Sequence, residues 1–406
     1  MARTMRIAYL SPLAPLRTRV ADYSEELLPH LCRRAQVDAY TDDRVAATQE
    51  VGRAYPLYGY RDLAAQRERY DQLIFQLASD PEHVPIYELF LRSGGVAVLH
   101  DLNLSELAAA GRAAQTDGAG PLREARAGGG LGPFLQTAAS LLFRRPWQEP
   151  GDQEVMRLLG RQATGVIVSS PTARDALLAR LPGVPVRHVP LGIASPPAID
   201  AAEARQLLNL PAGAFVCLSL GPLDPQKRIH VAMQAFARLL ERCPASVYVL
   251  IGELAPGYPL TELAQTLGIA DRVRFTGYVD RPTLYRYLAA CDVGIALRQP
   301  AAGQVSAGVL RIMSMGRPVV VSRCEPYTRW PGHCLLKVDA GPGEAAQLVA
   351  TLWALSSHSP TRHWYGRRAA HFVQSRHSAA SVARQYVDFL EELAAVAAPQ
   401  VAERGA

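Results

Sequence analysis

A loop of small residues that opens a short predicted helix is the stretch best suited to chemistry, residues 301–322 (AAGQVSAGVLRIMSMGRPVVVS). Ser306 is a good helix N-cap, Gly316 suits the left-handed position after a helix, and Pro318 stops the helix from continuing. The first turn of such a helix presents unpaired N–H groups and the positive end of the helix dipole. The pattern suits a bound phosphate, although taken alone such a loop is more often an ordinary turn.

Two cations follow a glycine turn in residues 221–229 (GPLDPQKRI). Gly221 permits a tight turn at the end of a predicted strand, and Lys227 and Arg228 come soon after it. Because both side chains are long, they can reach a pyrophosphate at the carboxyl edge of that strand. A solvated helix start with a routine Lys-Arg pair is the alternative.

A third segment, residues 275–279 (FTGYV), ends a strand with a glycine turn. The backbone N–H and C=O groups of Gly277, Tyr278 and Val279 could bind the edge of a nucleobase without a specific side chain. This pattern is weak by itself.

The elements that position these residues alternate between apolar strands and amphipathic helices. Such alternation predicts two α/β halves with parallel sheets covered on both faces, with ligands beyond the carboxyl ends of the strands in a cleft between the halves. Strands are predicted at 5–10, 36–40, 71–77, 95–101 and 165–170, and then at 214–221, 245–253, 272–277, 292–297 and 318–322. Helices are predicted from about residue 20, and at 231–241, 260–267, 283–290 and 309–315.

The composition is that of a globular protein, with 49% hydrophobic and 20% charged residues. The net charge of +6 suits an anionic substrate or a weakly attracting membrane surface, and no dense basic track argues for nucleic acid. The six cysteines show no metal-ligand spacing. With no predicted signal or membrane-spanning segment, we expect a reduced, cytoplasmic protein.

The boundary between the halves is predicted in the Pro/Gly/Ala-rich run 190–211, giving domains at 1–192 and 193–377. An Ala/Gly/Arg-rich excursion is expected at about 108–147. Its segment 132–147 could be an interfacial membrane helix, or a helix packed on its own domain. A helix at 378–393 is expected to end the fold, with a disordered tail at 394–406.

Taken in order, these blocks resemble family 4 glycosyltransferases (group 1 glycosyl transferases), whose GT-B fold has two Rossmann-like domains facing across a cleft. The resemblance covers nearly the whole chain. In the second half it rests on residues 221–229, 275–297 and 308–322, and in the first half on SPLAPLRTRVADYSEELLPHL (11–31), YDQLIFQLASDPEH (70–83) and VAVLHDLNL (96–104).

The resemblance implies transfer of a sugar from a nucleotide-sugar donor, UDP- or GDP-linked, with retention at the anomeric carbon and with no cofactor or obligatory metal. The lack of any Asp-x-Asp agrees with metal independence. By the same match, Lys227 and Arg228 hold the phosphates, Gly221 and residues 277–279 belong to the donor site, and His100 lies near the transferred sugar. The backbone of Val305, Ser306, Ala307 and Gly308 holds the phosphate and ribose. Arg19, Asp22 and His83 are acceptor-side candidates.

Two departures concern how the donor is held. The family's two glutamates correspond here to Gly303 and Arg311, which cannot accept hydrogen bonds as carboxylates do, although Gln304 could supply a neutral substitute. In the first-domain loop at 17–19, Arg19 stands where the family often has glycine. The acceptor (a glycan, lipid or small molecule) and the sugar stay open.

Two hypotheses from different classes therefore stand. The first is an active glycosyltransferase. The second is a non-catalytic GT-B relative acting as a partner or regulatory subunit, motivated by the missing glutamate pair. A nicotinamide oxidoreductase is disfavoured because SPLAPL, rather than GxGxxG, follows the first strand.

Overall fold

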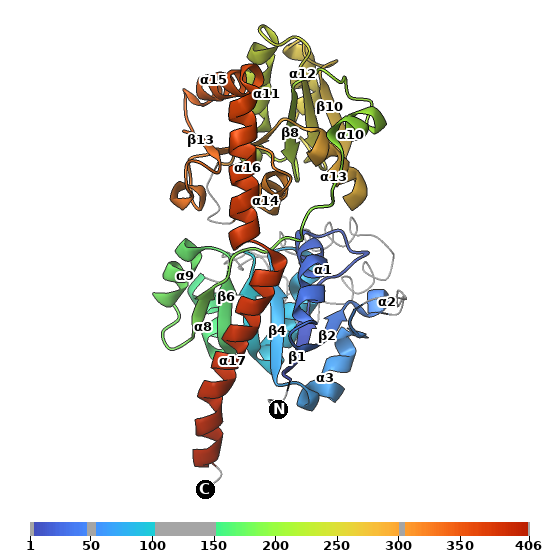
Figure 1. Ribbon diagram of the computed structural model, residues 1–406. Coiled ribbons are helices and arrows are strands. Elements are labelled where there is room, and N and C mark those ends of the chain that lie inside the picture. The colour runs from blue at the N-terminus through green and yellow to red at the C-terminus, as the bar shows by residue number, and fades with distance from the viewer. Residues whose placement is uncertain (1–3, 47–53, 102–151, 300–304, 405–406) are drawn as a thin grey trace. The chain divides into compact units, whose positions relative to one another are not determined.

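Figure 1 shows the computed structural model of the protein, which describes residues 4–46, 54–101, 152–299 and 305–404. The chain forms two compact units. Unit 1 comprises residues 1–192 and 380–406, and unit 2 comprises residues 193–379. The expected excursion at 108–147, including the segment 132–147, lies outside the described residues, as do Gly303 and Gln304.

Unit 1 is built on a seven-stranded parallel sheet in the order β3-β2-β1-β4-β5-β6-β7. Five of these strands were predicted. The other two, β3 and β7, are three-residue edge strands, too short to show a hydrophobic period. The strands are β1 (Arg6–Leu10), β2 (Gln36–Thr41), β3 (Leu57–Gly59), β4 (Gln72–Leu77), β5 (Gly95–Leu99), β6 (Ala163–Val168) and β7 (Val186–His188).

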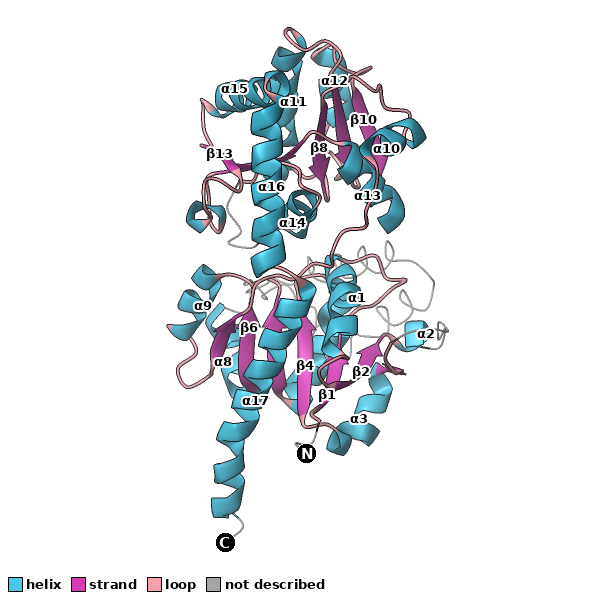
Figure 2. Cartoon of the chain, in the orientation of Figure 1, coloured by secondary structure: helices cyan, strands magenta, loops and turns pink. Residues whose placement is uncertain are grey.

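Helices cover both faces of this sheet (Figure 2). On one face α1 and α17 meet through a hydrogen bond of 2.9 Å between the hydroxyls of Tyr23 and Tyr386. On the other face Phe75 and Phe90 pack in an apolar core with α4 and α8. The helices are α1 (Arg19–Leu31), α2 (Asp43–Ala46), α3 (Leu63–Gln66), α4 (Val84–Ser93), α8 (Asp152–Gln162), α9 (Pro171–Leu178) and α17 (Ala379–Arg404).

The last helix corrects the prediction for the C-terminus. It was expected to end at residue 393, before a disordered tail, but α17 continues to Arg404. The segment after Leu393 is rich in alanine, which has the highest helix propensity, and this extends the helix. Its preceding turns pack on β6, where Leu393 and Phe389 lie against the bare backbone of Gly165.

Unit 2 has a six-stranded parallel sheet in the order β10-β9-β8-β11-β12-β13. As in unit 1, strand order reverses beside the first strand of the sheet, so β8 and β11 are neighbours. Only the short edge strand β13 was not predicted. The strands are β8 (Val216–Leu220), β9 (Val247–Ile251), β10 (Val273–Gly277), β11 (Val293–Ala296), β12 (Val319–Ser322) and β13 (Leu336–Val338).

Helices flank this sheet too, and one of them, α10, lies inside the run 190–211 that was predicted to be a boundary region. Asp200 caps it by accepting a hydrogen bond of 2.8 Å from the backbone N–H of Glu203. The helices are α10 (Ala201–Leu207), α11 (Ile229–Leu240), α12 (Leu260–Thr266), α13 (Arg281–Ala290), α14 (Ala307–Ser314), α15 (Glu344–Ser357) and α16 (Ser359–Arg376).

The backbone of α16 lies directly against the backbone that follows α14. A Cβ atom on Gly366 would lie 2.0 Å from the carbonyl oxygen of Gly316, so only glycine fits at this crossing. Gly316 itself has φ of +68°, as predicted for the residue that ends its helix. The two ends of unit 2 also pair with each other, because Ile193 exchanges backbone hydrogen bonds of 2.9 Å with His377 and Ala379.

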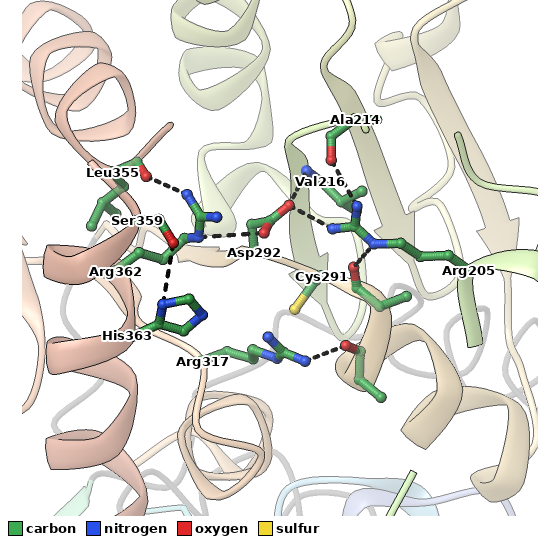
Figure 3. Close-up of polar contacts among 12 residues, drawn as sticks. Arg205, Ala214, Val216, Cys291, Asp292, Arg317, Leu355, Ser359, Arg362 and His363 are labelled. Carbon is green, nitrogen blue, oxygen red and sulfur yellow. Dashed lines mark hydrogen bonds and ion pairs between the residues drawn. The ribbon is translucent and has the colours of Figure 1, made fainter. Parts of the chain in front are cut away.

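A buried carboxylate ties together the amino ends of β8 and β11 (Figure 3). Asp292 is only 8% exposed, and its Oδ2 accepts hydrogen bonds of 2.8 Å from both the Val216 N–H and the Arg205 guanidinium. Its Oδ1 lies 3.4 Å from Nε of Arg362. The arginines come from α10 and α16, so this one side chain joins two strands and two helices.

We expect Asp292→Asn to lower the free energy of unfolding by about 3–5 kcal/mol, because it removes a buried charge that neutralises two partly buried guanidinium groups. Urea denaturation followed by tryptophan fluorescence measures the change. The control is Asp271→Asn, whose side chain is 73% exposed beside Arg272 and whose ion pair should contribute under about 1 kcal/mol. Equal effects of the two substitutions would contradict this assignment.

Candidate functional sites at the strand ends

The carboxyl end of β8 places an ammonium group against bare backbone. Nζ of Lys227 donates a hydrogen bond of 2.8 Å to the carbonyl of Leu220, the last residue of the strand. Gly221, which follows, has φ of +109°, and a Cβ atom there would lie 2.2 Å from Nζ. Glycine is therefore required both for the turn and for the approach of the lysine.

The identity of this cation is also informative. The chain has 41 arginines and two lysines, Lys227 and Lys337. Nζ of Lys337 donates hydrogen bonds to two loop carbonyls, those of Thr328 and Trp330. An ammonium is compact and its donors rotate, whereas a guanidinium is a wide planar fork, so lysine suits the narrow space beside Gly221.

The side chain of Arg228 is less available to a ligand than expected, because it is bound to a carboxylate. It has φ of +49° and its Nε donates a hydrogen bond of 2.7 Å to Oε2 of Glu344, which one terminal nitrogen also contacts. Glu344 is fully buried at the start of α15 and also accepts from the hydroxyl of Ser322. The carboxylate fixes the arginine in place and offsets part of its charge.

The first turn of α14 meets the same strand end. As predicted, Ser306 caps this helix by accepting from the N–H of Val309. Its own N–H donates to the Tyr327 hydroxyl at 3.1 Å, and burial raises the pKa of that phenol to about 12. A Cβ atom on Gly308 would lie 3.3 Å from the Leu220 side chain, which brings α14 against β8.

The remaining donor-site residues flank this point. Val305 and Ala307 are partly buried around the cap, and Arg311 lies further along α14, where it interacts with other groups.

The predicted base-binding turn is connected to the phosphate turn through backbone. Gly277 has φ of +66° and its carbonyl accepts the N–H of Gly252 at 2.9 Å. A Cβ atom on Gly252 would in turn lie 2.1 Å from the Gly221 carbonyl oxygen. Tyr278 is 49% exposed and Val279 is partly buried. The ends of β8, β9 and β10 are thus brought together by glycine contacts.

Arg298 was not among the predicted residues. It follows β11, and its N–H donates a hydrogen bond of 2.9 Å to Ser322. Its Nε is buried and has no hydrogen-bond partner among the described residues. An unpaired buried guanidinium nitrogen is costly unless a ligand satisfies it. The available signal was a lone arginine directly after the apolar run 292–297.

In unit 1, His100 lies after β5, where its Nε2 is 2.7 Å from Oε1 of Gln76. Because an amide oxygen only accepts, this nitrogen carries the proton, and Nδ1 is left as the acceptor. Burial, with the neighbouring His83 second, lowers the pKa of His100 to about 3. The imidazole is therefore neutral at physiological pH.

His83 belongs to the core of unit 1 in this structure, and its acceptor-side role stays a prediction. Its side chain is fully buried, and its Nδ1 bonds the Gln76 carbonyl at 2.8 Å. Gln76, which the sequence analysis missed because it lies inside an apolar strand, thus contacts both histidines. The hydrogen bond ties His83 to the backbone of β4 near its carboxyl end.

Arg19 is paired rather than an isolated cation. It begins α1, which Thr18 caps, and its guanidinium lies 3.7 Å from Asp80 and 3.6 Å from Asp101. Asp22 lies in the first turn of the same helix, where a carboxylate is favourable to the dipole. These groups gather at the carboxyl ends of β1, β4 and β5, where strand order reverses in unit 1.

Comparisons agree with this architecture. HepE from Anabaena, solved in complex with UDP-glucose, superposes with a TM-score of 0.67 and 18% identity, covering 96% of this chain and all of that one. Sucrose-phosphate synthase from Thermosynechococcus elongatus gives 0.65 and 18% identity, covering 97% of this chain and all of that one. The fold is GT-B, with two Rossmann-like parallel-sheet units.

Sequence comparison finds matches to part of the chain. Residues 214–355 match the model described as "Glycosyl transferases group 1". The lipopolysaccharide core biosynthesis glycosyltransferase LpsE of Rhizobium meliloti is 35% identical over 36% of this chain and 40% of its own. The D-inositol 3-phosphate glycosyltransferase 2 of Catenulispora acidiphila is 34% identical over 30% and 31%. The chain thus spans well under half of these relatives. The expected resemblance to group 1 glycosyltransferases is confirmed.

Every helix among the described residues is too short or too polar to span a lipid bilayer. In the same part of the chain, no three His, Cys, Asp or Glu side chains gather as a metal site.

We expect His100 to show no protonation between about pH 5 and 8, because its pKa lies near 3. Carbon-13 NMR of histidine-labelled protein measures this, with the resonance assigned by its loss in His100→Gln. The unfolded chain takes up this proton near pH 6.5, so this group makes folding less favourable as the pH falls below that value. A protonation midpoint of His100 near pH 6.5 in the folded protein would contradict the burial of its imidazole.

Proposed function

We propose that the protein is a glycosyltransferase that moves a sugar from a nucleotide-sugar donor, a UDP-sugar, to an acceptor hydroxyl. The observation that carries the proposal is the set of cations where strand order reverses in unit 2. Lys227 and Arg298 follow β8 and β11, and the capped start of α14 lies against β8. Open parallel sheets bind ligands at this point, and donors of this kind suit a diphosphate.

The chemistry requires the bond between the anomeric carbon and the diphosphate oxygen to break. A new bond forms to the acceptor oxygen, whose proton passes to the departing diphosphate in the retaining, metal-independent reaction that the family resemblance implies. Lys227, Arg298 and the N–H groups of α14 would stabilise the charge that develops on the diphosphate. Arg228, held by Glu344, would supply a fixed positive charge beside them.

We assign the sugar contact to unit 1. A neutral His100 with Nδ1 free of the proton can accept a hydrogen bond from a sugar hydroxyl, which a protonated ring cannot. Gln76 fixes this tautomer. A non-catalytic relative remains the outcome to test, since Arg311 stands where the family has a glutamate.

The two lysines give a direct test. Acetic anhydride should modify both, and saturating UDP should protect Lys227 while Lys337 in the same molecule serves as the control. Lys227→Ala should weaken UDP binding by about 1.5–3 kcal/mol, or roughly 10- to 150-fold, the value of a charge-assisted hydrogen bond. Mass spectrometry and calorimetry measure the two effects. Equal protection of both lysines, or an unchanged affinity in the variant, would remove Lys227 from the site.

Arg298→Gln should weaken UDP binding about 10-fold and leave uridine binding unchanged, because the side chain is assigned to the diphosphate. Arg323→Gln is the matched control. It follows the neighbouring strand β12, is 52% exposed and pairs with Asp339. Calorimetry with both ligands measures the difference. Equal loss for uridine and UDP would show a structural role instead.

Activity is the final criterion. Incubation with UDP-sugars should give slow donor hydrolysis even with no acceptor, and Lys227→Ala should reduce its rate. UDP binding without any hydrolysis or transfer would favour the non-catalytic relative.

A further inference from the structure

The positive charge of the chain is concentrated near its C-terminal end. Residues 345–387 contain five arginines and four histidines but no aspartate or glutamate. The whole chain has a net charge of only +6, so this segment holds most of the excess. Its central element is α16, which has four arginines and no acidic residue.

One face of α16 is anchored and the other is open. Gly366, Ala369, Phe372 and Val373 are buried, with Gly366 against the end of α14. The remaining face is exposed at positions that recur along the helix, namely His363, Trp364, Arg367, Arg368 and His371. We call these five residues the basic face of α16. The fourth arginine of the helix, Arg376, lies at its C-terminal end over the ring of the buried Phe372.

The neighbouring helices do not neutralise this face. Both α14 and α15 contact α16. The three described helices together carry five arginines and a single carboxylate, that of Glu344, which is fully buried and bound to Arg228. Arg362 is turned inward to Asp292 (Figure 3), so the outward charge comes from the basic face itself.

An aromatic side chain lies within this charge. Trp364 is 39% exposed, and the guanidinium of Arg368 lies 5.3 Å from its ring centre. Tyr365 packs edge-on against it at 4.9 Å. Exposed tryptophan beside arginine on one helix face is typical of proteins that lie at a membrane surface, where the indole enters the headgroup region. A nucleic acid would also be attracted by the positive charge, but its binding would give no role to an exposed indole on a flat helix face.

We propose that the basic face of α16 docks on an anionic lipid bilayer. The arginines contact lipid phosphates and Trp364 inserts between headgroups. This surface is separate from the donor site and does not depend on the proposed transferase activity. It is also distinct from residues 132–147, for which the sequence suggested an interfacial helix.

The test is sedimentation of the full chain with vesicles of phosphatidylcholine, with and without phosphatidylglycerol. Binding should require phosphatidylglycerol and weaken as salt is raised. Arg367→Glu/Arg368→Glu should lower the partition coefficient at least about 10-fold, because each arginine near an anionic surface contributes on the order of a factor of five. Trp364→Ala should lower it further without changing the salt dependence.

The matched control is Arg33→Glu/Arg34→Glu, an adjacent exposed pair in unit 1 with the same change in charge. It should bind like the unaltered protein. Should the glutamate pair unfold the chain, as judged by circular dichroism, Arg367→Gln/Arg368→Gln takes its place. Three results would overturn the proposal. They are an equal loss of vesicle binding in both pairs of variants, binding to neutral vesicles alone, and binding to a single-stranded RNA oligonucleotide in place of vesicles.

Discussion

The reversal of strand order between β8 and β11 is the constraint on which the rest of unit 2 depends. Because both strands are parallel and adjacent, the loops that leave them diverge to opposite faces and leave backbone exposed between them. On the other side of β8, toward β9, the strand ends are joined by glycine turns rather than side chains, since Gly221 and Gly252 meet within backbone distance. The ammonium of Lys227 can then lie on the strand end itself. No bulky residue at position 221 could keep that contact.

Charge is distributed differently at the two edges of this sheet. At the amino edge, Asp292 neutralises arginines from two helices and serves stability. At the carboxyl edge the only fully buried carboxylate among the described residues is Glu344, and it engages Arg228 while Lys227 lies on a carbonyl oxygen. An anionic ligand would therefore meet cations that are already held in position, which lowers the entropic cost of binding it.

Local sequence signals were enough to predict much of this. The Ser306 cap, the Gly316 stop and the turn at Gly221 each depend on a few neighbouring residues, and each is present in the structure. Ten apolar runs predicted ten of the strands, while β3, β7 and β13 were too short to show a period. The fold class followed from this alternation together with the family resemblance.

The tertiary partners could not be predicted in the same way. Glu344 is 116 residues from Arg228, and nothing near either residue indicates their pairing. The burial of His83 depends on how α4 packs on the sheet, and the role of Gln76 depends on two histidines that the fold brings to it. Arg298 is recognisable only in the folded chain, where its Nε is buried with no hydrogen-bond partner in the part of the chain that the structure describes. Such facts arise from packing, which no short window of sequence contains.

The backbone hydrogen bonds that join Ile193 to His377 and Ala379 bring the two ends of unit 2 together. Unit 2 enters and leaves at adjacent points, and the chain then returns to unit 1 as α17. In topological terms unit 2 is an insertion within a Rossmann-like host. Two halves that were simply joined end to end would not give this path. Because α17 is the last element of unit 1 and follows all of unit 2 in the chain, it is synthesised only after unit 2 is complete.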